Sequence, residues 1–152
     1  MSGLILPKEG ELAVDSHPFA ELDAVQWREG VSFIEQIPAV FEGTLRENVH
    51  IGNLEASSED VDAVLARLQL NDSAEREIAT VQQLSGGELK KISLGRALLR
   101  DANLIVFDEP FEHLDDCGRQ VVGEMLADPT KTRICIQHRS SSSFTAENLI
   151  KV

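Results

Sequence analysis

The sequence of 152 residues predicts an α/β fold with a mainly parallel central sheet. Three short apolar runs, at 31–34, 104–107 and 133–136, are bounded by polar or turn residues, which is typical of strands buried on both faces. Helical patterns separate these runs, and strands that alternate with helices form a parallel sheet covered on both faces. A chain of this length forms one domain with a single core. Weaker strand candidates lie at 11–14 and 148–152.

The charge balance of the chain limits its partners. Asp and Glu outnumber Lys and Arg by 26 to 14, which gives a net charge of −12. A field of this sign repels nucleic acid and anionic lipid, so we expect no nucleic-acid partner. No apolar run approaches the ~20 residues that span a bilayer, so we expect no direct membrane insertion and a cytoplasmic location. Cys117 and Cys135 form no Cys-x-x-Cys pair and are expected to be reduced thiols.

The segment 43–83 is expected to be largely helical and to contain no strand. Ser57 and Asp60 have the spacing of a capping box, in which each side chain bonds the other's backbone N–H at a helix start. The apolar positions that follow have the i, i+3, i+4, i+7 spacing of a helix with one buried face: Val61, Val64, Leu65 and Leu68. We interpret this segment as a helical insertion after the first central strand.

Polar side chains follow the three central strands. Gln36 comes after the first strand, Asp108 and Glu109 after the second, and His138 after the third. Ligands of parallel sheets bind beyond the carboxyl ends of the strands, so these residues are expected to face one crevice. Adjacent carboxylates point in different directions, so one can hold Mg²⁺ while the other activates a water molecule. Taken singly, Asp-Glu-Pro can be a turn, and His138 a hydrogen-bonded strand-end histidine.

A second site candidate begins the helix after residue 84. Ser85 and Glu88 have the spacing of a capping box, and Gly86 and Gly87 allow a ligand to approach the backbone closely. Such a helix start is suited to an anion. By itself, the pattern favours a well-capped helix without a ligand.

Together, these segments resemble the nucleotide-binding domain of ABC transporters. Its signature motif, Walker B strand, D-loop and switch histidine correspond to Leu-Ser-Gly-Gly-Glu at 84–88, Leu-Ile-Val-Phe-Asp-Glu-Pro at 104–110, Leu-Asp at 114–115 and His-Arg at 138–139. Ile-Glu-Gln-Ile-Pro at 34–38 is similar to the Q-loop of exporter-type members. The resemblance implies a partial P-loop NTPase fold. Its parts would be a sheet core with Q-loop at 1–42, a helical subdomain with the signature helix at 43–100, and the Walker B, D-loop and switch-histidine region at 101–152.

The resemblance also implies roles for single residues, with ATP and Mg²⁺ as cofactors. Glu109 would be the general base, His138 would contact the γ-phosphate, and Asp108 with Gln36 would serve Mg²⁺. The other residues expected to contact nucleotide are Ser85, Gly86, Gly87, Glu88 and Asp115. Members of the family pair head to tail, so that each signature motif meets the ATP of the other domain. The implied partners are therefore another such domain and a membrane permease, which would place the chain at the inner face of the membrane.

The sequence departs from the family pattern in several places. Glu88 stands where the family more often has glutamine, Glu-His-Leu-Asp at 112–115 replaces Ser-Ala-Leu-Asp, and Val81 stands where exporters usually have glycine. None of the ten glycines is followed by lysine, so no phosphate-binding P-loop is present. We therefore expect an amino-truncated exporter subunit that neither binds nor hydrolyses ATP alone. A non-catalytic module that offers its signature motif in trans and a gene remnant remain alternatives.

Overall fold

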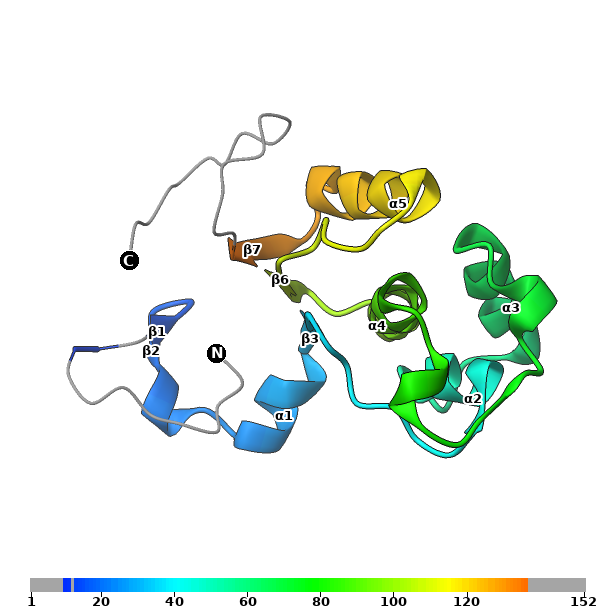
Figure 1. Cartoon of the computed structure of the whole chain (residues 1–152). Helices are drawn as coiled ribbons and strands as arrows, with labels where there is room; N and C mark the ends of the chain where they lie inside the picture. The colour runs from blue at the N-terminus through cyan, green and yellow to red at the C-terminus, as the bar shows by residue number, and fades with distance from the viewer. Residues whose placement is uncertain (1–9, 12, 137–152) are drawn as a thin grey trace.

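The computed structural model describes residues 10–11 and 13–136, and Figure 1 shows the arrangement of their elements. The main elements, in chain order, are β1 (Ala13–Val14), β2 (His17–Pro18), α1 (Ala24–Glu29), β3 (Val31–Ile34), β4 (Gly43–Thr44), α2 (Leu45–His50), α3 (Ser58–Arg67), β5 (Glu77–Ile78), α4 (Gly86–Arg100), β6 (Leu104–Asp108), α5 (Asp116–Ala127) and β7 (Thr132–Ile136). Short 3₁₀ turns occur at Phe19–Glu21, Asn71–Ser73 and Val81–Gln83. The candidate strand at 148–152 and His138 lie outside the described residues, and only Ala13–Val14 of the candidate at 11–14 is assigned as strand.

The central sheet has the strand order β3-β6-β7, and both pairs are parallel. Ile34 lies opposite Phe107, which in turn lies opposite Cys135. The three predicted strands and their parallel arrangement are therefore confirmed. Because all three run the same way, their carboxyl ends meet at one edge of the sheet, where the sequence places Gln36, Asp108 and Glu109.

Helices α4 and α5 cover one face of the sheet. Ile34, Ile105 and Phe107 point to this face and share one apolar core with buried residues of both helices, such as Leu94 and Val122. Side chains alternate along a strand, so the next residues point to the opposite face. On that side, Phe33 at one edge is 36% exposed and Ile136 at the other is 46% exposed.

The prediction that the strands are buried on both faces is wrong for β7, whose residues are intermediate or exposed. It holds for the middle strand β6, where Ile105, Val106 and Phe107 are all buried. Within the part of the chain that the structure describes, β7 has a neighbour on one side only. The apolar run of β7 is similar in length and composition to that of β6, so the sequence alone could not show that β7 is less buried.

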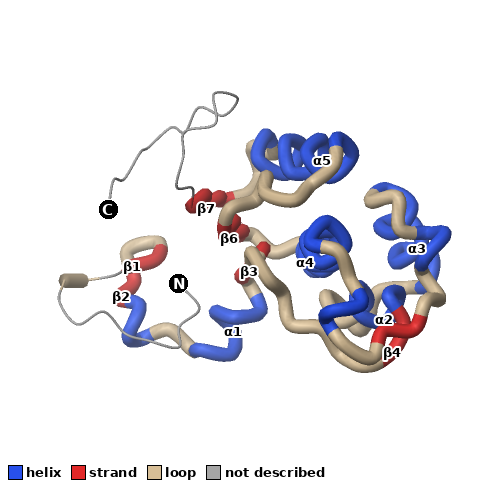
Figure 2. Tube along the Cα trace, in the orientation of Figure 1, coloured by secondary structure: helices blue, strands red, loops and turns tan. Residues whose placement is uncertain are grey.

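The segment between β3 and α4 folds as two short helices against α4 (Figure 2). Ser57 caps α3, its hydroxyl accepting from the N–H of Asp60 while the Asp60 carboxylate accepts from the N–H of Ser57, at 3.1 Å each. This capping box was predicted, as was the buried face that includes Val61 and Leu65. The expectation of no strand is wrong in one detail, since β4 and β5 form an antiparallel pair of two residues each. Two-residue strands are too short to show a sequence periodicity.

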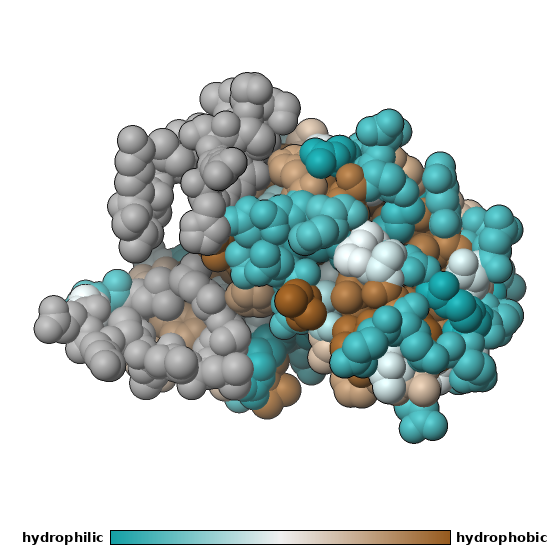
Figure 3. All heavy atoms as spheres, viewed as in Figure 1, coloured by the Kyte–Doolittle hydropathy of each residue, from teal (hydrophilic) through white to brown (hydrophobic). Residues whose placement is uncertain are grey.

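Hydrophilic residues make up much of the described surface in the view of Figure 3. Their side chains cover much of the outer faces of α3 and α5 in Figure 3. No described helix is long and apolar enough to cross a bilayer.

Candidate functional site

The first group of candidate residues lies where β3 and β6 end. These strands are paired up to Ile34 and Phe107, so the residues that follow, from Glu35 and Asp108 onward, begin side by side. The Gln36 side chain donates from Nε2 to Glu112 Oε2 over 3.0 Å, which links the loop after β3 to the turn after β6. The structure therefore places the segment that carries Gln36 beside the segment that carries Asp108 and Glu109.

Glu109 has an unusual backbone conformation. Its φ is +47°, in the left-handed region that residues with a side chain rarely adopt. Its N–H donates to the Ile136 carbonyl over 3.0 Å, which ties it to the end of β7. A strained conformation persists only where the surroundings hold it, and such residues occur often at functional sites.

Lys90 on α4 is the main feature of this region that the sequence interpretation missed. The residue is 2% exposed, and its Nζ donates to the carbonyls of Asp108 at 2.6 Å and Glu35 at 3.1 Å. Burial lowers the pKa of Lys90, while the charges of Asp108, Glu112 and Glu109 act in the opposite direction. A signal was available, because Lys90 stands four residues before the buried Leu94 and therefore on the apolar face of its helix.

The chemistry of the strand ends fits a hard cation. Gln36 uses its amide nitrogen for Glu112, which leaves its oxygen available, and the Asp108 carboxylate accepts no hydrogen bond from the described residues. Carboxylate and amide oxygens are ligands of Mg²⁺, which keeps several of its waters when bound. The described residues contain no cluster of three or more His, Cys, Asp and Glu that could hold a metal ion by themselves. Any ion here would need further ligands, such as water or phosphate oxygens.

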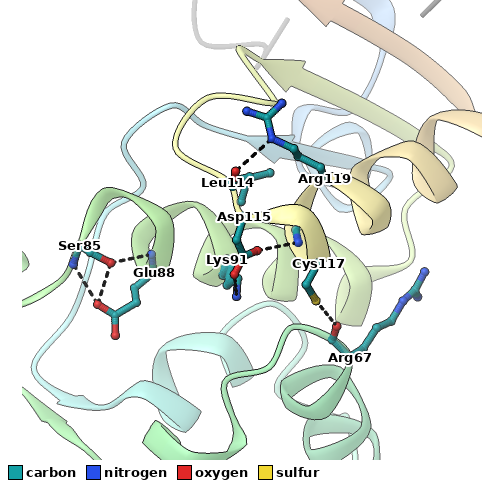
Figure 4. Close-up of polar contacts among 9 residues, drawn as sticks. Arg67, Ser85, Glu88, Lys91, Leu114, Asp115, Cys117 and Arg119 are labelled. Carbon is teal, nitrogen blue, oxygen red and sulfur yellow. Dashed lines mark hydrogen bonds and ion pairs between the residues drawn. The ribbon is translucent and has the colours of Figure 1, made fainter. Parts of the chain in front are cut away.

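The second group of candidate residues surrounds the start of α4. The Ser85 hydroxyl accepts from the Glu88 N–H at 3.2 Å, and the Glu88 carboxylate accepts from the Ser85 N–H at 2.9 Å, as Figure 4 shows. The predicted capping box is therefore confirmed. Burial alone would raise the pKa of Glu88, but bonds from Ser85 and Arg76 hold it below its usual value. Arg76 reaches Glu88 at 2.5 Å, so a negative charge at Glu88 is compensated within the chain.

Gly86 and Gly87 allow the turn after β6 to approach the start of α4 closely, and the residue of that turn nearest to them is His113. A methyl group placed on Gly87 would lie 2.9 Å from the His113 carbonyl oxygen, and one on Gly86 would lie 3.2 Å from the His113 ring. His113 itself has a φ of +59°. The turn after β6 therefore requires a glycine at 87, where the contact is with backbone, whereas at 86 a methyl group would only crowd the His113 ring.

A hollow of about 200 Å³ opens beside this helix start. Its lining includes Ser85, Gly87, Glu88, Lys91, His113 and Asp115. Asp115 accepts from Lys91 Nζ at 2.7 Å with one carboxylate oxygen and from the Gly118 N–H at 2.9 Å with the other. The bond from Lys91, followed by that from Gly118, lowers the pKa of Asp115. Asp115 is thus the N-cap of α5, it lines the hollow, and its bond with Lys91 is drawn in Figure 4.

The two groups of residues do not form one pocket. The lining of the hollow contains neither Gln36 nor the pair Asp108 and Glu109. Helix α4 connects the groups, because Ser85 caps its first turn and Lys90 lies in its second. The described residues therefore present two separate groups of candidate residues, one at the strand ends and one at the helix start.

Comparisons with known proteins assign the chain to a family. The family model described as "ABC transporter" matches residues 1–112. The mycobactin import ATP-binding/permease protein IrtB of Mycolicibacterium thermoresistibile is 35% identical over 162 residues, covering 100% of this chain and 28% of the relative. The glutathione/L-cysteine transport system ATP-binding/permease protein CydC of Escherichia coli is 33% identical over 141 residues, covering 88% of this chain and 25% of the relative. The chain thus spans about a quarter of the length of these relatives.

The fold agrees with this assignment. The structure of a bacterial Atm1-family ABC exporter with ATP bound superposes with a TM-score of 0.79 at 25% sequence identity, covering 90% of this chain and 26% of that chain. The α/β fold with a parallel three-stranded sheet is therefore that of an ABC exporter nucleotide-binding domain. On the combined match of the family model, the relatives and the fold, the chain belongs to the ABC transporter family.

Proposed function

We propose that this chain is an ATPase component of an ABC exporter that contributes two half-sites to head-to-tail pairs of nucleotide-binding domains. The separation of the two half-sites along α4 is the observation that carries this proposal. A single ATP on the chain would need both groups of residues in one pocket. Two nucleotides, one at each half-site, need them apart.

The helix start would serve the ATP that is bound to a partner domain. Ser85 and Gly87 line the hollow, and the first turn of α4 offers backbone N–H groups and the positive end of the helix dipole. These groups favour a phosphate despite the net charge of −12, because they act at short range. Lys91, in the lining of the hollow, adds a positive charge that Asp115 partly compensates.

The strand ends would serve an ATP held by the same polypeptide. Glu109 would accept a proton from the attacking water, while Asp108 and Gln36 would hold Mg²⁺ through oxygen ligands. When bound, the ion would neutralise charge on the phosphates. No Gly-Lys pair occurs in the sequence, so the phosphate cradle for this half-site is not among these 152 residues.

Complementation with a disabled partner tests the half-site at the helix start. The partner is an intact ABC exporter nucleotide-binding domain whose own signature serine is replaced by arginine, so that it hydrolyses little ATP. Adding this chain should restore hydrolysis at the partner's P-loop. Ser85→Arg should abolish that restoration, because its side chain would occupy the phosphate position. Ser58→Arg, an exposed serine on α3, is the matched control and should restore hydrolysis as the unaltered chain does. Equal restoration by both variants would refute the assignment.

The half-site at the strand ends needs a P-loop in the same polypeptide for its test. When a Gly-x-x-x-x-Gly-Lys-Ser/Thr segment is joined ahead of these residues, Glu109→Gln should leave ATP binding intact and reduce turnover roughly 10²-fold or more, since it removes a general base. Undiminished turnover in that variant would show that Glu109 is not the base.

A non-catalytic module that offers only its signature motif in trans is the second candidate. The completeness of the helix-start half-site within the described residues favours it. This candidate predicts restoration in the complementation experiment together with no effect of Glu109→Gln in any P-loop fusion. A gene remnant predicts no restoration at all.

A further inference from the structure

We propose that Lys90 is a positioning residue that fixes the backbone carrying Gln36 and Glu109. This inference rests on the proposed function for the importance of those two side chains, but its geometry does not depend on any nucleotide. Lys90 lies on α4, and its ammonium group reaches the ends of β3 and β6 at the strand-end half-site.

The two carbonyls that Lys90 binds are those directly before the proposed functional residues. Glu35 precedes Gln36, and Asp108 precedes Glu109. Beyond Ile34 and Phe107 the β3–β6 ladder stops, so at the next step along each strand a carbonyl is left without a partner from the ladder. Glu35 is exposed and Asp108 is half-buried, and a partly buried carbonyl without a donor loses hydrogen-bond energy. Lys90 provides donors to both, at 2.6 Å and 3.1 Å, and as a cation it makes charge-assisted bonds.

The contact with Asp108 also bears on the strained conformation of Glu109. The peptide unit between these two residues has its oxygen bound by Lys90 and its N–H bound by the Ile136 carbonyl at 3.0 Å. Both polar atoms of the peptide are thus fixed from opposite elements, α4 and β7. This clamp lies immediately before the φ of +47°, and it supplies the local restraint that a left-handed residue with a side chain requires.

Helix α4 holds the other strand end through two residues one turn apart. The Ser93 hydroxyl accepts from the Glu35 N–H at 3.2 Å, while Lys90 donates to the Glu35 carbonyl. Both polar backbone atoms of the residue before Gln36 are therefore held by the signature helix. Among the described residues, the titratable groups that act on the ammonium are the carboxylates of Asp108, Glu112 and Glu109 and the Cys135 thiol. Its positive charge therefore also offsets the crowding of negative groups there.

Amide hydrogen exchange on the full chain without nucleotide tests the inference. The reporters are the N–H groups of Glu109 and Glu35, whose acceptors are not on Lys90. Lys90→Met keeps the length of the side chain and removes its donors. Exchange at both reporters should accelerate at least about tenfold, as the loss of charge-assisted hydrogen bonds implies. Core amides within α4, such as that of Leu94, should accelerate much less.

Lys91→Met is the matched control, since Lys91 is a neighbouring lysine on the same helix and is also buried, at 7% exposed. It should leave the two reporters unchanged and instead accelerate exchange at Gly118, whose N–H donates to Asp115. Lys90→Gln keeps a donor without the charge and should restore part of the protection lost in Lys90→Met. A merely structural role predicts equal acceleration at reporters and core amides, and no restoration by Gln. Either result would overturn the inference.

A measurement on the unaltered chain covers the case in which Lys90→Met does not fold. The Nζ protons of Lys90, followed by NMR of the ammonium group, should exchange with water more slowly than those of an exposed lysine, because two carbonyls bind them. Rapid exchange would refute the inference. The proposed function stands or falls separately, since Ser85→Arg and Glu109→Gln test it by hydrolysis and this experiment needs no ATP.

Discussion

At the scale of single residues, several polar side chains of both proposed half-sites already make contacts within the chain. Asp115 caps α5 and pairs with Lys91, Glu88 caps α4, and Gln36 bonds Glu112. Each side chain thus has a structural role whether or not nucleotide binds. A substitution at the site therefore changes stability as well as function, and the two effects must be measured separately.

Asp115→Asn separates the charge of this carboxylate from its capping role, because Asn also caps helices well. The pKa of Asp115 is lowered in the folded chain, mainly by Lys91. Its contribution to stability is therefore present above the unfolded pKa and is lost as pH falls through the folded pKa. With a side chain 52% exposed, the expected loss in Asp115→Asn at pH 7 is only about 0.5–1 kcal/mol.

Thermal unfolding of the unaltered chain and of Asp115→Asn between pH 7 and pH 3 measures this pH-dependent loss of stability. The difference in unfolding free energy should be constant above about pH 5 and shrink below about pH 4, where the unfolded carboxyl begins to bind its proton. Glu55→Gln is the control, since the Glu55 side chain is exposed and makes no hydrogen bond or ion pair with the described residues, and it should give a difference that varies less with pH. A difference for Asp115→Asn that grows on acidification would contradict the ion pair.

At the scale of elements, α4 organises the chain through the side chains on its buried face. Lys90 reaches the strand ends, and one turn and a half later Arg96 reaches the segment after β3. Arg96 donates to the carbonyls of Asn48 and Ala39 at 2.7 Å each. Burial lowers the pKa of Arg96, and Phe41 lies under its guanidinium, with 5.8 Å to the ring centre. This arginine joins α2, α4 and the loop that carries Gln36.

Arg96→Met should therefore lower the free energy of unfolding by about 2–4 kcal/mol, since it leaves several carbonyl acceptors without a donor. Arg100→Met is the matched control on the same helix. Arg100 is exposed and donates to the carbonyls of Arg28 and Glu29, so its loss should cost less than about 1 kcal/mol. Urea denaturation followed by circular dichroism checks both, and equal losses in the two variants would show that Arg96 is not the central contact.

The elements that could be predicted from the sequence are those fixed by local signals. The capping boxes at Ser57 and Ser85 predict the starts of α3 and α4, and the apolar runs predict β3, β6 and β7. Features fixed by contacts between distant residues escaped prediction. The buried contact of Lys90 with strand ends 18 and 55 residues away is one example, and the exposure of β7 is another. Periodicity reports which face is apolar, but not which polar group of another element lies opposite it.

At the scale of the whole molecule, the two proposed half-sites are separated, and the sequence contains no Gly-Lys pair that would form a phosphate cradle. The helix-start half-site contributes a hollow of about 200 Å³ with one lysine, already paired with Asp115. The strand-end half-site contributes mainly carboxylates. The molecule as a whole carries a net charge of −12, which repels a polyanion such as ATP except at short range. Tight binding would need a partner domain that brings its own positive groups.

The chain of 152 residues should therefore bind Mg-ATP only weakly when alone. We expect a Kd above about 1 mM, which corresponds to a binding free energy weaker than about −4.1 kcal/mol. Calorimetric titration measures this, and an intact ABC nucleotide-binding domain in the same buffer is the positive control. Raising the salt concentration should not weaken whatever binding occurs as strongly as it does for a basic phosphate site, because the long-range field of this chain is repulsive. A Kd in the micromolar range would mean that the described half-sites hold nucleotide without a separate phosphate cradle.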